Sequence, residues 1–146
     1  MTNKLGDYLT QEGYKKIKLR LTKTNHFEIR ATINGVKGRF ILDTGASSSC
    51  IGFDEAEQFN LITKESEIMA AGAGATDMPT KISKQNTLKI GDWNKEKVVL
   101  VLFNLTHVNT ALINHDSQPV DGIIGADILT KGKAIIDYEK KYLYLK

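Results

Sequence analysis

The chain has 146 residues, of which 41% are apolar and 25% charged, the size and balance of one soluble globular domain and too short for two substantial cores. The formal net charge of +3 is too small to indicate a nucleic-acid-binding surface. A single cysteine excludes an intrachain disulfide and a zinc site built on paired cysteines.

No segment of the sequence predicts membrane insertion or secretion. Every apolar run is much shorter than the roughly 18 residues that a membrane-spanning helix needs. The first residues, Met-Thr-Asn-Lys-Leu-Gly-Asp-Tyr, lack the apolar h-region of a signal peptide. We therefore expect a cytoplasmic protein, unless a leader peptide has been removed, with neither a membrane nor a nucleic acid among its partners.

Alternating apolar and polar residues predict the first strands. Residues 16–22 alternate aliphatic with mainly basic side chains, the period-two pattern of a half-buried strand, and we interpret the basic face as solvated. The alternation returns over residues 27–33, followed by Asn34-Gly35 and a second apolar run at 39–42. Because asparagine and glycine both tolerate positive φ, this order predicts a β-hairpin.

The rest of the chain predicts short elements joined by turns. Residues 54–59 are expected to form a short helix with Asp54 as its N-cap. The remaining expected elements are a hairpin between 67–70 and 78–82, a hairpin between 87–90 and 98–103, an apolar strand at 122–125, a brief helix at 126–129, and a last hairpin between 134–138 and 142–145. Together they predict an all-β, barrel-like domain.

One apolar strand runs directly into an acidic side chain, Asp43. Residues 40–47 are Phe-Ile-Leu-Asp-Thr-Gly-Ala-Ser, so hydroxyls and a turn-forming glycine follow the carboxyl at once. Such a loop can hold a carboxylate rigidly among hydrogen-bond donors. Taken alone, the same residues also fit an ordinary turn.

A second motif lies about 80 residues downstream, where residues 121–129 are Asp-Gly-Ile-Ile-Gly-Ala-Asp-Ile-Leu. Taken alone, it predicts a buried strand bounded by glycines. The distance suits a barrel strand that returns beside Asp43, and the small residues 71–76 of a predicted hairpin lie between the two motifs. The order of these three parts is distinctive.

In this order of parts the chain resembles the retropepsin-like aspartic proteases, the single-domain relatives of the pepsins. Their pattern is an apolar strand, Asp-Thr-Gly-Ala-Ser, a flap hairpin, and then two apolar residues, a glycine and a short helix. The resemblance implies the acid-protease fold, an all-β closed barrel with a flap hairpin and one or two short helices. We expect this domain over residues 26–146, with residues 1–25 as an N-terminal extension that packs on or flanks it.

The resemblance also implies an aspartic endopeptidase without metal or cofactor. Aspartic peptidases activate water between two carboxyls that share one proton. The chain has a single Asp-Thr-Gly motif, so Asp43 would have to meet Asp43 of a second copy across a two-fold axis. We therefore expect a homodimer that binds an extended peptide or protein substrate.

Further roles follow from the same resemblance. Thr44 would bond across the dimer interface, and Gly45 would lie near the substrate backbone. Ala46 and Ser47 complete the loop around the catalytic residue. The remaining implied site residues are Ile123, Ile124 and Gly125, which would support the loop, and Ala71, Gly72, Ala73, Gly74 and Ala75, which would form the substrate-binding flap.

Two alternatives to an active peptidase stay open at this point. One is a non-catalytic retropepsin-like module for dimerisation or peptide binding. The other is a latent enzyme whose N-terminal residues must move or be removed. A phosphate-binding loop at residues 72–74 is disfavoured, because no Gly-Lys-Ser/Thr follows.

The histidines and the cysteine have simpler interpretations. His26, His107 and His115 lack the spacing of metal ligands, and we expect them at the surface or in local hydrogen bonds. Cys50 has no obvious histidine partner and is expected to be a buried structural thiol.

Overall fold

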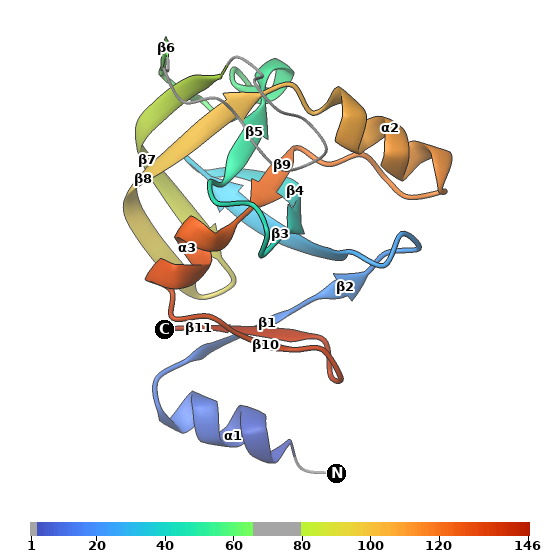
Figure 1. The fold of residues 1–146 in the computed structure, drawn as a ribbon. Coiled ribbons are helices and arrows are strands. Elements are labelled where there is room, and N and C mark those ends of the chain that lie inside the picture. The colour runs from blue at the N-terminus through green and yellow to red at the C-terminus, as the bar shows by residue number, and fades with distance from the viewer. Residues whose placement is uncertain (1–2, 66–79) are drawn as a thin grey trace.

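Six strands form a closed barrel (Figure 1) in the computed structural model, which describes residues 3–65 and 80–146. These strands are β3 (Phe27–Ile33), β4 (Val36–Leu42), β5 (Cys50–Gly52), β7 (Lys81–Ile90), β8 (Trp93–Phe103) and β9 (Gly122–Ile124). They follow the order β3-β4-β9-β5-β8-β7, and pairing of β3 with β7 completes the ring. Two short strands extend the sheet, β2 (Arg20–Leu21) on β3 and β6 (Thr63–Glu65) on β7. The predicted all-β barrel is confirmed.

The β3–β4 hairpin forms as the sequence predicts. The two strands pair antiparallel from Phe27 opposite Leu42 to Ile33 opposite Val36. Asn34 and Gly35 at the turn have φ of 51° and 84°, the left-handed conformations that a tight hairpin turn requires. The β7–β8 hairpin and the terminal hairpin of β10 (Ile135–Asp137) and β11 (Tyr142–Leu145) are likewise confirmed.

Strands β4 and β9 lie side by side in the centre of the fold. They pair in parallel, with Ile41 opposite Ile123 and Leu42 opposite Ile124. Leu42 and Ile124 belong to the barrel core, whereas Ile41 and Ile123 belong to a second apolar cluster outside it. Because both faces of these strands are buried, their sequences are continuous apolar runs rather than alternating ones.

The N-terminal residues pack on the C-terminal hairpin. Strand β1 (Lys15–Lys18) pairs antiparallel with β11, giving a three-stranded sheet in the order β1-β11-β10 that lies below the barrel in Figure 1. Helix α1 (Lys4–Gln11) precedes this sheet. The single strand predicted over residues 16–22 is therefore divided at Leu19, so that β1 and β2 join different sheets.

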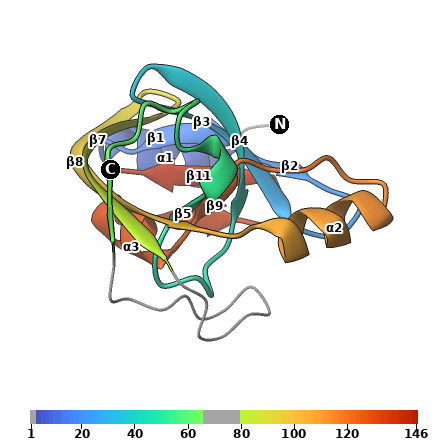
Figure 2. The same ribbon diagram turned by 90° about the horizontal axis from the view of Figure 1, so that it is seen from above.

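The helices differ most from the prediction. Residues 54–59 do not form the expected helix; a 3-10 turn, η1 (Phe53–Glu55), is capped by Gly52, and the Asp54 side chain makes no cap bond. The segment has too few apolar residues for a helical stripe. Helix α3 (Ala126–Lys131) is confirmed, whereas α1 and α2 (Thr106–Asn114) are additional to the predicted elements. Figure 2 shows that α2 projects from the side of the barrel.

The predicted hairpin at 67–82 falls largely on residues 66–79, which lie outside the described residues. Strands β6 and β7 on either side of this stretch pair antiparallel, with Glu65 opposite Lys81. None of the helices within residues 3–65 and 80–146 has the length and apolar character needed to cross a membrane.

Candidate active site

Asp43 follows β4 directly, at the end of its pairing with β9. Its backbone N–H donates to the Ile124 carbonyl at 2.9 Å, which continues the parallel ladder by one residue. The Asp43 side chain is partly buried, between the buried last residues of β4 and an exposed Thr44. The carboxyl therefore stands at the boundary between the core and solvent, as the sequence predicts.

Residues 43–47, the Asp43 loop, form a tight turn around the carboxyl. The Gly45 N–H donates to Asp43 Oδ1 at 2.9 Å, and the Ala46 N–H donates to the Asp43 carbonyl at 3.2 Å. A Cβ on Gly45 would lie 3.3 Å from Oδ1, tighter than an ordinary contact. The turn therefore favours glycine at this position and holds one carboxylate oxygen on a backbone donor.

The segment after β9 closes on the Asp43 loop from behind. The Ala126 N–H donates to the Ala46 carbonyl at 2.7 Å. A Cβ on Gly125 would lie 2.5 Å from that same carbonyl oxygen, a distance that real side chains do not reach. Gly125 is thus required by the close approach of two backbones, and the structure brings the two sequence motifs into direct contact.

A buried polar network, missed by the sequence analysis, joins the loop to α3. Ser49 is fully buried; its hydroxyl donates to Asp127 Oδ1 at 2.7 Å and accepts from the Gly125 N–H at 2.8 Å. The same Asp127 oxygen accepts the backbone N–H groups of Ser49 and Ile128. The one feature of the sequence that could have indicated this network is Asp127, an aspartate at the start of a predicted helix and two residues after Gly125.

The other predicted site residues differ in their burial and in their position relative to the Asp43 loop. Ala46, Ile123 and Ile124 are buried beside the loop, whereas Thr44 and Ser47 are exposed. Thr44 lines a shallow hollow of about 340 Å³ with residues of α3 and β10. The predicted flap residues 71–75 lie outside the described residues. The roles assigned to all these residues remain predictions.

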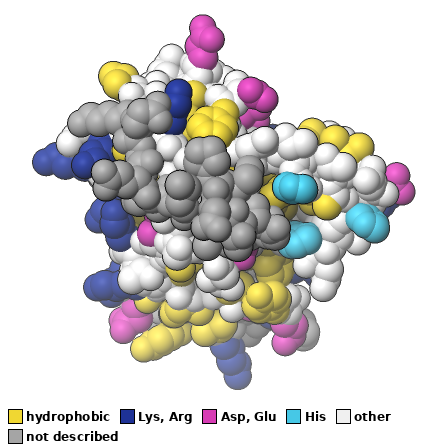
Figure 3. Space-filling model, turned by 45° about the horizontal axis from the view of Figure 1, so that its top comes forward, with side chains coloured by type: hydrophobic (Ala, Val, Ile, Leu, Met, Phe, Trp, Pro, Cys, Tyr) yellow, Lys and Arg dark blue, Asp and Glu magenta, His cyan; other side chains and the backbone are white. Residues whose placement is uncertain are grey.

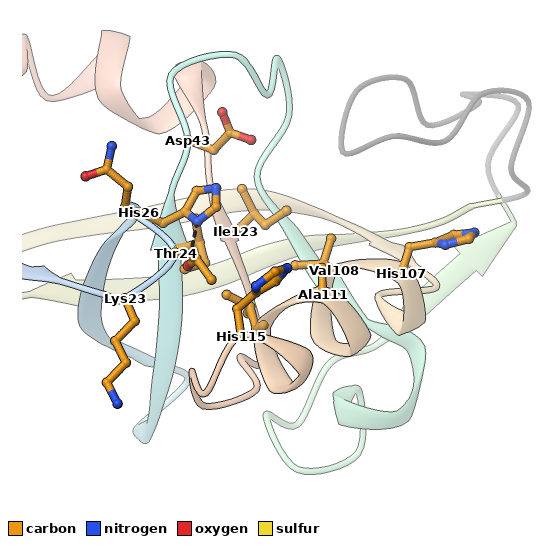
Figure 4. A pocket seen from close by; sticks show the side chains of 12 residues that line it. Lys23, Thr24, His26, Asp43, His107, Val108, Ala111, His115 and Ile123 are labelled. Carbon is orange, nitrogen blue, oxygen red and sulfur yellow. Dashed lines mark hydrogen bonds between the residues drawn. The ribbon is translucent and has the colours of Figure 1, made fainter.

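A larger pocket of about 570 Å³ lies on the other side of Asp43. Its apolar surface comes from Ile41, Ile123 and one side of α2, and its polar rim from residues 23–26 and α2. All three histidines of the chain line it: His26, His107 and His115. We call it the histidine pocket (Figure 4), and Figure 3 shows the histidine side chains gathered on one face of the molecule.

The individual histidines fit the expectation of surface or locally bonded side chains. All three are exposed, and His26 Nδ1 lies 2.8 Å from Thr24 Oγ1. Within residues 3–65 and 80–146, no group of three or more histidine, cysteine, aspartate or glutamate side chains is placed to hold a metal ion. Their convergence on one pocket was not predicted, because they are far apart in the sequence.

Cys50 is a buried thiol, as predicted. Removal from water raises its pKa to about 12; a backbone hydrogen bond at Ile123 acts against this rise, and the negative charges of Asp127 and Asp43 add to it. The thiolate is therefore suppressed at neutral pH, which is the opposite of what a cysteine nucleophile needs.

Comparison with known proteins identifies the class of protein. The family model described as aspartyl protease matches residues 29–128, which include both motifs of the site. The chain therefore belongs to the aspartyl protease family.

Among curated proteins, the chain is 27% identical over 117 residues to the Gag-Pol polyprotein of Walleye dermal sarcoma virus, a match that covers 80% of this chain and 6% of the polyprotein. This chain thus corresponds to a small part of that relative.

Solved structures share the fold at low sequence identity. A retropepsin-like aspartic protease from Rickettsia conorii has a TM-score of 0.61 at 20% identity, covering 90% of both chains. The EIAV protease, solved with the inhibitor HBY-793, has a TM-score of 0.56 at 19% identity, covering 75% of this chain and 90% of its own. The retroviral protease-like domain of Ddi1 from Leishmania major has a TM-score of 0.55 at 17% identity, covering 87% and 90%. The retropepsin-like fold is confirmed.

Proposed function

We propose that the protein is an aspartic endopeptidase in which Asp43 residues from two copies of the chain form the catalytic pair. The observation that carries this proposal is the position of the Asp43 carboxyl. It lies at the rim of a pocket, partly exposed, with one oxygen held by the Gly45 N–H. Its loop is anchored to β9 and α3 by backbone hydrogen bonds, so the carboxyl is fixed before a substrate arrives.

The chemistry requires two carboxyls with one proton between them, because like charges so close together cannot both be ionised. The carboxylate takes a proton from a bound water while the water oxygen attacks the peptide carbonyl carbon, and the neutral carboxyl donates its proton to the carbonyl oxygen. Collapse of the tetrahedral intermediate then transfers a proton to the leaving nitrogen as the C–N bond breaks. No covalent intermediate with the enzyme forms.

The second carboxyl is supplied by a second copy of the chain in this proposal. The sequence has one Asp-Thr-Gly motif, so a two-fold axis beside Asp43 would generate the pair. The exposed Thr44 and the hollow that it lines suit a surface that meets this second copy. Ile124 and Gly125 would support the loop from behind, and residues 71–75 would form the flap over the substrate.

We further propose that residues 26–146 form the catalytic domain and that residues 1–25 are an extension packed on it. The pairing of β1 with β11 supports this packing, and so does the hydrogen bond of 3.4 Å from Asn3 Nδ2 to the Tyr144 hydroxyl. The extension joins the C-terminal sheet through β1, and its last residues, Lys23, Thr24 and Asn25, line the histidine pocket.

Mass-spectrometric mapping of a diverse peptide pool tests the proposal. Wild-type protein and Asp43→Asn, both checked for dimer formation and folding, would be incubated with the pool between about pH 4 and 7. Cuts present with wild type and absent with Asp43→Asn support the endopeptidase. If two folded dimers leave every peptide intact, the proposal fails, and truncation before Glu28 then distinguishes a latent enzyme from a non-catalytic module.

A further inference from the structure

We propose that the histidine pocket selects substrates with a glutamate side chain close to the cleaved bond, and that His26 and His115 determine this preference. The inference rests on the proposed endopeptidase function and names its substrate class. It starts from the position of the pocket, which shares Asp43, Ile41 and Ile123 with the site. A side chain near the cleaved bond would therefore reach this pocket.

His26 is oriented by its own turn. The Thr22 N–H donates to the His26 carbonyl at 2.8 Å, and the His26 N–H donates to Thr22 Oγ1 at 3.2 Å. Thr24 Oγ1 lies 2.8 Å from both Thr22 Oγ1 and His26 Nδ1. This chain of contacts holds the imidazole by Nδ1 and leaves Nε2 to meet a ligand.

His115 lies at the C-terminal end of α2. It is the C-cap residue, and its N–H donates to the Leu112 carbonyl at 3.2 Å. The carbonyl groups at a helix C-terminus interact favourably with a positively charged side chain at this position. In Figure 4 the rings of His26 and His115 lie toward the middle of the lining side chains, whereas the His107 ring points outward.

The pocket combines this basic rim with an apolar base. Ile41, Leu112 and Ile123 are buried residues of one apolar cluster, and Val108 packs against it. Among residues 3–65 and 80–146, the titratable or charged residues that line the pocket are Lys23, His26, Asp43, His107 and His115. Asp43 is engaged in catalysis, so the remaining charge that the pocket can offer a substrate is positive. An aliphatic stem that ends in a carboxylate, as in glutamate, complements both parts.

The preference should depend on pH in a defined direction. Imidazole charge increases as the pH falls below neutrality, and a glutamate side chain loses its charge below about pH 4. The preference for glutamate over glutamine should therefore be larger under mildly acidic than under alkaline conditions.

The test uses a peptide that the wild-type protein cleaves in an Asp43-dependent manner. Glutamate, glutamine and leucine are placed in turn at each of three positions on both sides of the cut, and kcat/KM is measured at pH 5.5 and pH 8. We expect glutamate to exceed glutamine by about fivefold or more at one position at pH 5.5. The ratio should fall toward one in the double variant His26→Gln/His115→Gln and persist in the control Lys37→Gln, which changes an exposed residue of β4 outside the pocket lining.

A lysine double variant separates charge from shape. His26→Lys/His115→Lys should show the glutamate preference at both pH values, because lysine side chains carry their positive charge across this range. The inference is overturned if wild type shows no glutamate preference at any position, or if the preference survives in the glutamine double variant. Either result leaves the endopeptidase standing. If no peptide is cleaved in an Asp43-dependent manner, both proposals fail.

Discussion

The Asp43 loop and the histidine pocket meet at one carboxylate but are built from different kinds of contact. The loop is held by backbone hydrogen bonds and close backbone approaches to β9 and α3, with buried partners on its inner side. The rim of the pocket consists of exposed side chains on a turn and on a helix that projects from the barrel. In the proposed peptidase, rigid placement of the reacting group and adjustable recognition of a substrate would thus be carried by separate parts of the structure.

The largest expected effect is on catalysis. Asn is nearly isosteric with Asp, and its side-chain oxygen can still accept the Gly45 N–H, so Asp43→Asn should fold normally. It removes a carboxyl that must exchange protons, and kcat should fall by about a thousandfold or more on every peptide. Steady-state cleavage assays test this. Substantial residual activity would show that the reaction does not depend on the loop.

The next largest effect is on stability and concerns Gly125. Because a Cβ there would lie 2.5 Å from the Ala46 carbonyl oxygen, Gly125→Ala should lower the free energy of unfolding by about 3 kcal/mol or more. Gly45→Ala is the matched control in the same loop, since its Cβ would meet Asp43 Oδ1 at 3.3 Å and the exposed turn can adjust. Urea unfolding measures both. Equal losses of unfolding free energy in the two variants would contradict the claim that the loop is tightly packed at Gly125 and can adjust at Gly45.

Ser49 tests the buried network. Ser49→Ala leaves the Gly125 N–H without its hydroxyl partner in a buried position, which should cost about 1 to 3 kcal/mol of unfolding free energy. The neighbouring Ser48→Ala serves as the control and should change it by less than about 0.5 kcal/mol. If the two alanine variants unfold at the same urea concentration, the network does not stabilise the loop.

The last effect concerns Cys50 and is confined to alkaline pH. Its pKa is raised from 9.0 to about 12 by burial, so the folded state retains the thiol proton more strongly than the unfolded chain. The stability that this provides is complete below pH 9 and is lost as the pH rises from about 9 to 12. The unfolding free energy of wild type should therefore decline more steeply over this range than that of Cys50→Ala. Parallel pH profiles would contradict a buried thiol.

Local patterns made much of this structure predictable. Asn34-Gly35 specified a hairpin because its conformational preferences act within two residues. The apolar runs around Ile41 and Ile123 predicted two strands, and in the structure both faces of these runs are buried. The motifs around Asp43 and Gly125 were recognisable as parts of one site through their resemblance to the retropepsin-like proteases, and the structure places them in contact.

Other features depend on contacts that no local pattern encodes. Ser49 and Asp127 bond across 78 residues of sequence. Helix α2 buries only Leu112 among its residues, so it has no apolar stripe to predict it. The histidine pocket brings together residues from 23 to 123, and only the closed barrel makes them neighbours.

The central claim is that two copies of Asp43 act together, and a mixing experiment tests it most directly. Wild type and Asp43→Asn are unfolded together in urea, refolded as an equal mixture, and assayed against a cleaved peptide at concentrations where the protein is dimeric. If both carboxyls are needed, only wild-type pairs are active, and random pairing leaves about a quarter of the activity of the same total amount of wild type. Retention of about half would contradict the account, because each chain would then act alone.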